Sequence, residues 1–105
     1  MPTDMPAGVT IERVYVIEGV YAPDAAEMRP RVRPQHLARI VQLMEEGIVI
    51  EGGGYLDLST SLILLRAEDE AAAFAIARED VYLREGVWVE VRVKPFGRLV
   101  RSDAR

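Results

Sequence analysis

The sequence predicts a single α+β domain whose strands and helices follow the order βαββαβ. Two helical patterns alternate with β-branched segments, and a chain of 105 residues is long enough for one hydrophobic core but not for two. Half of the residues are hydrophobic and 29% are charged, a mixture typical of folded globular domains. We expect the domain to span residues 11–97, with loose termini at residues 1–10 and 98–105.

Composition argues against several kinds of partner and site. The net charge is −4, and no basic helix or patch of Lys and Arg offsets it, so nucleic acid is not expected as a partner. The chain has no cysteine, which removes disulfides and thiolate nucleophiles and suits a reducing cytoplasm. Residues 1–10 lack the basic start and apolar core of a signal peptide, and no apolar run approaches the ~20 residues of a membrane span. A cytoplasmic protein without a membrane partner is therefore expected.

The first half of the chain predicts a strand and then a helix. Residues 14–20 are mostly β-branched or aromatic and are apolar on both faces for most of their length, as in a central strand. Residues 21–32 contain two prolines and predict a loop, after which Pro34 suits the first position of a helix, where its missing N–H has no partner to lose. Gly47 fits the left-handed cap at the end of this helix. The side chains of this helix that are predicted to be buried form a stripe of Leu37, Ile40, Val41 and Met44.

A hairpin is predicted next. Residues 48–50 and 61–65 have the composition of strands, and the glycines at 52–54 should interrupt the first of them with a bulge or turn. These glycines do not match a phosphate-binding loop, because no helix follows them and no G-K-[ST] is present.

The last part of the chain predicts a second helix and a fourth strand. Asp69 can cap the helix, which should end near Asp80. In residues 87–93 valines alternate with other side chains, as in a strand with two unlike faces. We interpret Trp88 in this strand as a packing residue rather than as part of a pocket. The thin apolar stripe of the helix consists of Ala72, Ala73, Ile76 and Ala77.

This order of elements is the ferredoxin-like fold, an antiparallel four-stranded sheet with both helices on one face. So short a chain has no third layer for the other face, so we expect that face to be covered by the sheet of a second copy, giving a homodimer. A monomer remains open if the face is polar, since Glu18, Glu90 and Arg92 could point there.

The predicted topology gathers chemically useful residues at one end of the sheet. The start of the first helix, the end of the second helix with Tyr82, and the turn at residues 52–57 should meet there. In the first turn of a helix, the positive end of the macrodipole would keep the His36 ring neutral and able to act as a base. Asp80, at the negative end of a helix, needs a compensating partner. A hydrogen bond from His36 would satisfy Asp80 and fix the tautomer of the ring.

Simpler interpretations of these residues stay open. A single histidine at the start of a helix can be a solvated or capping residue, and Asp80 can pair with Arg78 or Arg84 in an exposed ion pair. On either interpretation, His36 and Asp80 belong to the surface end of the domain.

Three arginines, at positions 29, 31 and 33, make the segment before His36 locally basic. Arg29 and Arg33 could hold a carboxylate or a phenolate through their guanidinium groups, although a solvated loop is equally compatible with the pattern. A metal site is not expected, because the chain has a single histidine, no cysteine and no suitable spacing of carboxylates. No cofactor is expected either.

Several motifs, taken together, resemble the YciI-like (YCII-related) family. The resemblance covers roughly residues 14–96. Its motifs are Arg29-(x3)-Arg33-Pro34-Gln35-His36-Leu37-Ala38-Arg39, Glu46-Gly47, Asp80-Val81-Tyr82-(x3)-Gly86-Val87 and Val93-Lys94-Pro95-Phe96. The resemblance implies a ferredoxin-like fold in the dimeric α/β-barrel superfamily and a His–Asp pair, which falls on His36 and Asp80. It also implies a proline after the aspartate, where this chain has Val81. One member of the family resembles a dehydrochlorinase acting on a chlorinated hydroxyquinol.

The function expected from the residues and the resemblance is cofactor-free proton-transfer chemistry by a small enzyme. The reaction would be an elimination, isomerisation or hydrolysis of a small anionic or phenolic molecule. His36 would be the general base and Asp80 would orient it, while Arg29, Arg33 and Tyr82 would bind the substrate. Two alternatives remain: a ligand-binding or accessory domain without turnover, and a purely structural dimerisation module.

Overall fold

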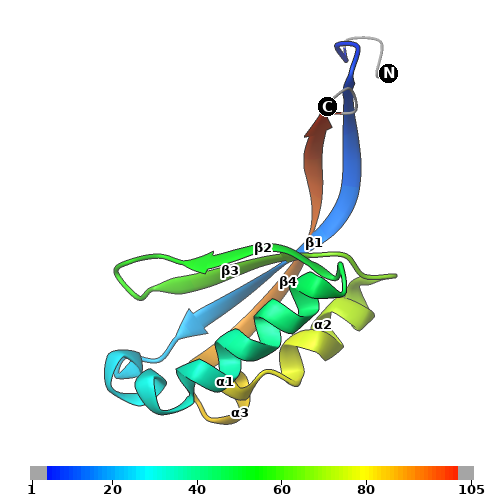
Figure 1. Ribbon diagram of the computed structural model, residues 1–105. Helices are drawn as coiled ribbons and strands as arrows, with labels where there is room; N and C mark the ends of the chain where they lie inside the picture. The colour runs from blue at the N-terminus through cyan, green and yellow to red at the C-terminus, as the bar shows by residue number, and fades with distance from the viewer. Residues whose placement is uncertain (1–4, 102–105) are drawn as a thin grey trace.

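Residues 5–101 are described by a computed structural model, in which four strands form one antiparallel sheet with the order β2-β3-β1-β4. Two helices cover one face of this sheet, and a short third helix leads into the last strand (Figure 1). The elements are β1 (Val9–Tyr21), α1 (Ala25–Glu45), β2 (Val49–Gly54), β3 (Thr60–Leu65), α2 (Glu70–Arg78), α3 (Val81–Arg84) and β4 (Trp88–Arg101). The predicted ferredoxin-like α+β fold is confirmed.

The hydrophobic core lies between the sheet and the helices. Alternate residues of the strands point toward it, because side chains of a strand alternate between its two faces, and Ile17, Ile63 and Leu65 are buried there. Ala73 and Ala77 supply the buried stripe of α2 as predicted, and their small side chains let the helix approach the sheet closely. Within residues 5–101, no helix is long and apolar enough to cross a membrane.

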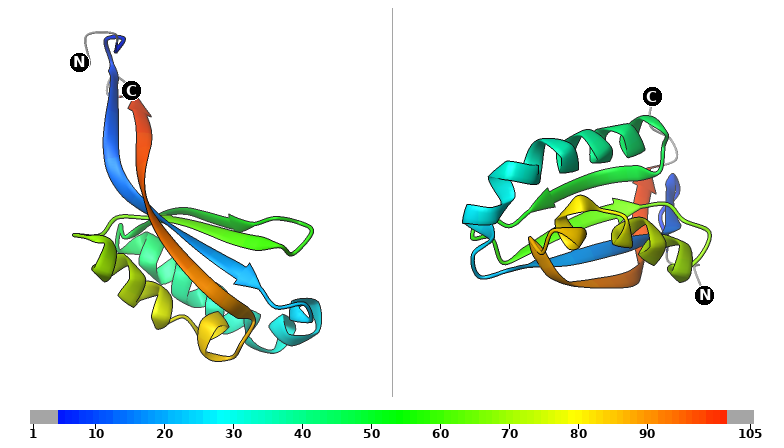
Figure 2. Two further views of the ribbon diagram at one scale, coloured as in Figure 1. Left: turned by 180° about the vertical axis from the view of Figure 1, so that it is seen from behind. Right: turned by 90° about the horizontal axis from the view of Figure 1, so that it is seen from below.

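Helix α1 begins at Ala25, so the predicted loop over residues 21–32 is wrong. Pro30 and Pro34 both lie inside the helix, although each lacks an N–H and disfavours a helix interior. The helix changes direction in its first turns, which accommodates the prolines (Figure 2). Ala25 and Val32 are buried in the core. This burial stabilises a helical segment that local sequence rules disfavour.

The buried face of α1 also differs from the prediction. Val32, His36 and Ile40, each four residues after the previous one, face the core. Of the predicted stripe only Ile40 is buried, whereas Leu37, Val41 and Met44 are between 40% and 51% exposed. The predicted buried stripe did not include His36, because it was chosen from apolar residues and histidine is polar. The burial of His36 is explained only by a hydrogen-bond partner far away in the sequence.

The turns and caps agree with the prediction more closely than the strand ends do. Gly47 has a φ of +78° after α1, and the Asp69 side chain accepts a hydrogen bond from the Ala72 N–H at 2.8 Å at the start of α2. The glycines at 52–54 do not interrupt β2, because the irregular register lies before them, between Val49 and Glu51.

Strands β1 and β4 extend beyond the rest of the sheet as a two-stranded ribbon, formed by residues 9–13 and 97–101, which we call the arm. It rises from the side of the sheet opposite the helices (Figures 1 and 2). The expectation of loose termini is therefore wrong for residues 9–10 and 98–101, which pair with each other. Residues 1–4 and 102–105 lie outside the described part of the chain.

Gly19 in β1 provides space for the buried indole of Trp88, because a Cβ at position 19 would overlap the indole ring. We therefore expect Gly19→Ala to lower the free energy of unfolding by about 1–3 kcal/mol through overpacking. Urea denaturation at a fixed protein concentration measures this. Gly53→Ala in β2 is the matched control, because a Cβ there would meet no atom within 4 Å, and its effect should stay below about 0.5 kcal/mol. Equal stability of the two variants would contradict this account of Trp88 packing.

Candidate functional site

His36 and Asp80 are joined by a short hydrogen bond, although 44 positions separate them in the sequence. His36 Nδ1 lies 2.7 Å from Asp80 Oδ1. Both side chains are buried, with His36 7% and Asp80 1% exposed. The expectation that these residues belong to the surface end of the domain is therefore wrong, and so is the interpretation of His36 as a solvated residue.

Their helical positions also correct the electrostatic argument. His36 lies well inside α1, because the helix begins at Ala25, and the macrodipole at the helix start therefore does not act on it. Asp80 follows α2 but is the N-cap of α3, where its Oδ1 accepts a hydrogen bond from the Tyr82 N–H at 2.9 Å. A carboxylate is favourable at the start of a helix. Val81 is the first residue of α3, a position that also suits the proline implied by the resemblance.

Arg39, one turn after His36 in α1, completes the surroundings of Asp80. Its Nη1 lies 3.4 Å from Asp80 Oδ2, and its Nη2 donates to the Ile76 carbonyl oxygen at 3.0 Å. The alternative partners, Arg78 and Arg84, form no ion pair with Asp80 in the described structure. An ionised carboxylate only accepts hydrogen bonds, and all the partners of Asp80 are donors or can be donors.

Three aromatic residues fix the plane of the imidazole ring. Tyr82 stacks on His36 with a centroid distance of 3.8 Å and an interplanar angle of 5°. Trp88 meets the His36 ring edge-on at 5.6 Å, and Tyr21 meets Tyr82 edge-on at 6.3 Å. Trp88 is thus a packing residue, as predicted, and its contact is with the site itself.

The polar atoms of this cluster lie among buried side chains, since His36 is 7% exposed and Tyr82 and Trp88 are each 1% exposed. Among the described residues, Trp88 Nε1 is the single buried side-chain polar atom without a hydrogen-bond partner. His36 Nε2 and the Tyr82 hydroxyl have no hydrogen bond within the described structure. When Nδ1 donates its proton to Asp80, Nε2 is an acceptor that a bound molecule can contact.

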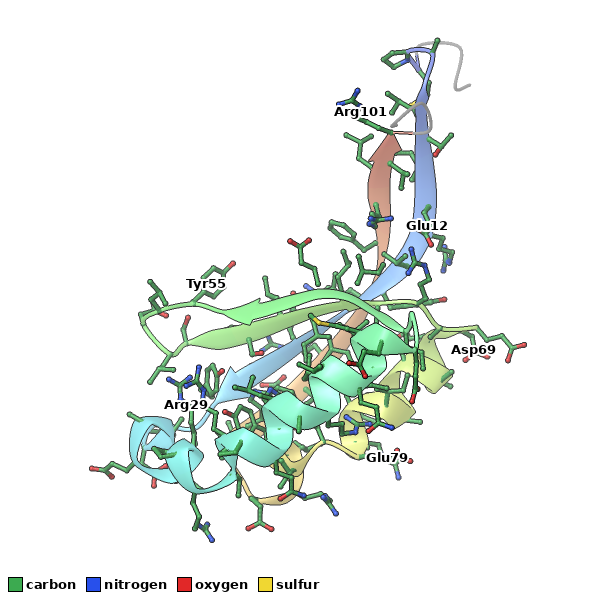
Figure 3. All side chains as sticks on the ribbon, in the orientation of Figure 1. Glu12, Arg29, Tyr55, Asp69, Glu79 and Arg101 are labelled. Carbon is green, nitrogen blue, oxygen red and sulfur yellow. The ribbon has the colours of Figure 1, made fainter. Side chains whose placement is uncertain are left out.

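Two of the three arginines lie near Tyr82. The pKa of the Tyr82 phenol is raised, because burial disfavours the phenolate and the Tyr21 hydroxyl adds to this effect, while the charges of Arg29 and Arg33 oppose it. Arg29 lies beside the end of β1 (Figure 3). Within residues 5–101, neither Arg29 nor Arg33 forms an ion pair, so their guanidinium groups are available to an anion.

Other parts of the predicted site are less well supported. Arg31 is exposed and is not among the groups that affect Tyr82. The turn at residues 52–57 approaches the site through Gly54, where a Cβ would lie 3.1 Å from the Tyr21 hydroxyl. The void next to Asp80 has a volume of about 10 Å³, room for roughly one water. Among the described residues, no group of three or more His, Asp or Glu side chains could hold a metal ion.

Sequence reasoning missed Arg39 and Tyr21. Arg39 is not part of the predicted buried stripe of its helix. Its spacing of three residues from His36 nevertheless places the two side chains on the same face, which is the signal that could have identified it. Tyr21 was assigned to a loop, whereas it is the last residue of β1. No local pattern indicates its contact with Tyr82.

The raised pKa of Tyr82 predicts a loss of stability at alkaline pH. The folded protein holds the phenolic proton more tightly than the unfolded chain, whose tyrosine pKa is about 10. The contribution to stability is therefore complete below about pH 10 and is lost as the pH rises through the folded-state pKa. Tyr82→Phe keeps the ring and should remove this component from urea unfolding measured between about pH 8 and about pH 11. Tyr55→Phe, at an exposed side chain, is the control and should behave like the wild type.

Comparison with known proteins identifies the relatives of this chain. The YCII-related domain family matches residues 14–97. Protein YciI of Escherichia coli is 36% identical over 93 residues, covering 79% of this chain and 95% of that protein. An uncharacterised protein of Haemophilus influenzae is 34% identical over 92 residues, covering 78% of this chain and 94% of its own length.

A solved structure shares the fold at low sequence identity. It is the 5-chloro-2-hydroxyhydroquinone dehydrochlorinase of Burkholderia phenoliruptrix in complex with 2,5-dihydroxybenzoquinone, with a TM-score of 0.69 and 18% identity. The match covers 79% of this chain and 92% of that one. The sequence matches and this shared fold agree, and the chain belongs to the YCII-related family.

Proposed function

We propose that this chain is a small enzyme that performs acid–base chemistry without a cofactor on a small anionic or phenolic molecule. The reaction would be an elimination, isomerisation or hydrolysis. The observation that carries the proposal is the buried hydrogen bond of 2.7 Å between His36 Nδ1 and Asp80 Oδ1, which leaves His36 Nε2 without a hydrogen bond and able to act as a base.

Each residue of the pair has a distinct role in this proposal. His36 Nε2 removes a proton from the substrate, and Asp80 holds the ring in the tautomer whose Nε2 is unprotonated. As the imidazolium forms, the carboxylate 2.7 Å away stabilises its charge. Arg39 holds the second oxygen of Asp80, so the carboxylate does not have to reorganise during the transfer.

The groups beside His36 favour an anionic or phenolic substrate. Arg29 and Arg33 provide positive charge near Tyr82, whose phenol is kept protonated by burial and can donate a hydrogen bond to an oxyanion. The fold relative is named for acting on a chlorinated hydroxyquinol ring, and its structure contains 2,5-dihydroxybenzoquinone. That quinone is acidic and planar, which makes it a suitable first ligand to test.

A homodimer is part of this proposal. The face of the sheet away from the helices has an apolar hollow of about 580 Å³. Glu18 at this face is paired with Lys94 at 3.6 Å, so the charged groups there are partly neutralised. A second sheet packed on this face would remove the apolar surface from water. The apolar side chains that line the hollow include Val16, Leu62, Leu64 and Phe96.

Ligand binding tests the substrate class. In titration calorimetry with 2,5-dihydroxybenzoquinone, the double variant Arg29→Gln/Arg33→Gln should bind at least about tenfold more weakly than the wild type, because two cations near the phenol are lost. Arg31→Gln removes one positive charge from the same helix, half of what the double variant removes, at a residue that is not among the groups affecting Tyr82, and it should bind like the wild type. Equal weakening by Arg31→Gln would mean that net charge alone attracts the quinone.

Turnover tests the assignment of the base. With 5-chloro-2-hydroxyhydroquinone as substrate and chloride release as the assay, His36→Ala should lose about 10²–10⁴-fold in kcat, the usual contribution of a general base. Asp80→Asn should retain more activity than His36→Ala, because the amide keeps part of the orienting contact but not the charge. Full turnover by His36→Ala would remove the catalytic assignment, and tight quinone binding without any chloride release would favour a ligand-binding domain.

A further inference from the structure

We propose that the arm, residues 9–13 and 97–101, clasps a second copy of this chain. This inference rests on the proposed homodimer and goes beyond it, because it assigns part of the interface to a segment outside the globular part of the domain. The arm projects from the side of the sheet that faces away from the helices (Figures 1 and 2). The lining of the apolar hollow on this side includes Phe96, which directly precedes the arm in β4.

The arm lacks packing of its own. Strand β3 pairs with β1 only over residues 15–20, so the two strands of the arm pair with each other alone. Ile11 and Leu99 are register partners and are 54% and 69% exposed. An isolated two-stranded ribbon is marginally stable in water, and exposed apolar pairs on it indicate a contact surface.

Ion pairs hold the arm in position. The Glu12 carboxylate lies 2.7 Å from Arg66 Nε, just after β3, and 2.9 Å from Arg98 Nη1, on the opposite strand of the arm. Arg66 also donates to the Gly47 carbonyl oxygen at 3.2 Å. The arm is thus tied to the body of the domain, and a preorganised arm loses less entropy when it binds.

A second copy of this chain fits the position and the charge of the arm. Phe96 lines the apolar hollow and is directly followed by the first residue of the arm in β4, so a body seated on the hollow lies alongside the arm. The arm carries Arg13, Arg98 and Arg101 against Glu12, whereas the whole chain has a net charge of −4. A basic arm and an acidic body are complementary between two copies.

The arm extends beyond the part of the chain that matches the YCII-related domain family. The YCII-related match covers residues 14–97, so nearly all of the arm lies outside it. Substitutions in the arm therefore leave the family's common part unchanged, which makes the arm testable separately from the proposed active site.

Sedimentation equilibrium of the full chain measures the contribution of the arm to the dimer. The double variant Ile11→Thr/Leu99→Thr places β-branched side chains, which suit strands, at both positions and should raise the dimer dissociation constant at least about tenfold. Val89→Thr is the matched control, because Val89 is also in β4 and 60% exposed but lies outside the arm, and it should leave the constant unchanged.

Cross-linking locates the contact. Because the chain has no cysteine, Leu99→Cys carries a benzophenone maleimide at that one position, and a mixture of ¹⁵N-labelled and unlabelled chains identifies links between subunits. We expect links between subunits, from position 99 to the body of the other copy. The inference would be overturned if the double variant dimerised with an unchanged dissociation constant, or if cross-links formed only within one chain. A monomeric wild type would also overturn it. Quinone binding by the double variant reports on the proposed function independently, since no arm residue lies at that site.

Discussion

The carboxylate of Asp80 is the point on which the arrangement of the helices depends. It forms a hydrogen bond with His36 Nδ1 of α1 and accepts one from the Tyr82 N–H at the start of α3. It also lies 3.4 Å from Arg39 Nη1, and Arg39 donates a hydrogen bond to the Ile76 carbonyl oxygen near the end of α2. Because a buried carboxylate without partners is strongly destabilising, these contacts together offset the burial of Asp80. The proposed catalytic group is therefore also a structural connection among three helices.

Aromatic packing extends this constraint to the sheet. Tyr82 stacks on His36, Trp88 meets both rings edge-on, and the indole lies against the bare backbone of Gly19 in β1. The plane of the imidazole is thus set by residues from α3, β4 and β1. An imidazole held by packing on both the helix side and the sheet side keeps its orientation without help from a bound molecule, as the proposed proton transfer requires.

The two faces of the sheet have different chemistry. The helix-covered face holds the polar pair within its aromatic surroundings, while the open face presents the apolar hollow and the paired charges of Glu18 and Lys94. The arm continues from the open face, beyond the part of the chain shared with the family. The two faces of β1 within the sheet thus have different surroundings, because Tyr15 and Ile17 point into the core and Val16 and Glu18 line the hollow.

The sequence by itself determined the order of the elements, the caps at Gly47 and Asp69, and the alanine stripe of α2, because each of these depends on residues within one or two turns of each other. It also indicated that His36 and Asp80 belong together, since the strand order brings their helices to one place. Tertiary structure alone decided that α1 starts at Ala25 despite Pro30 and Pro34, that His36 faces the core, and that the strand ends pair as an arm. These features depend on partners far away in the sequence, whose burial and hydrogen bonds outweigh local propensity, and a local pattern carries no information about them.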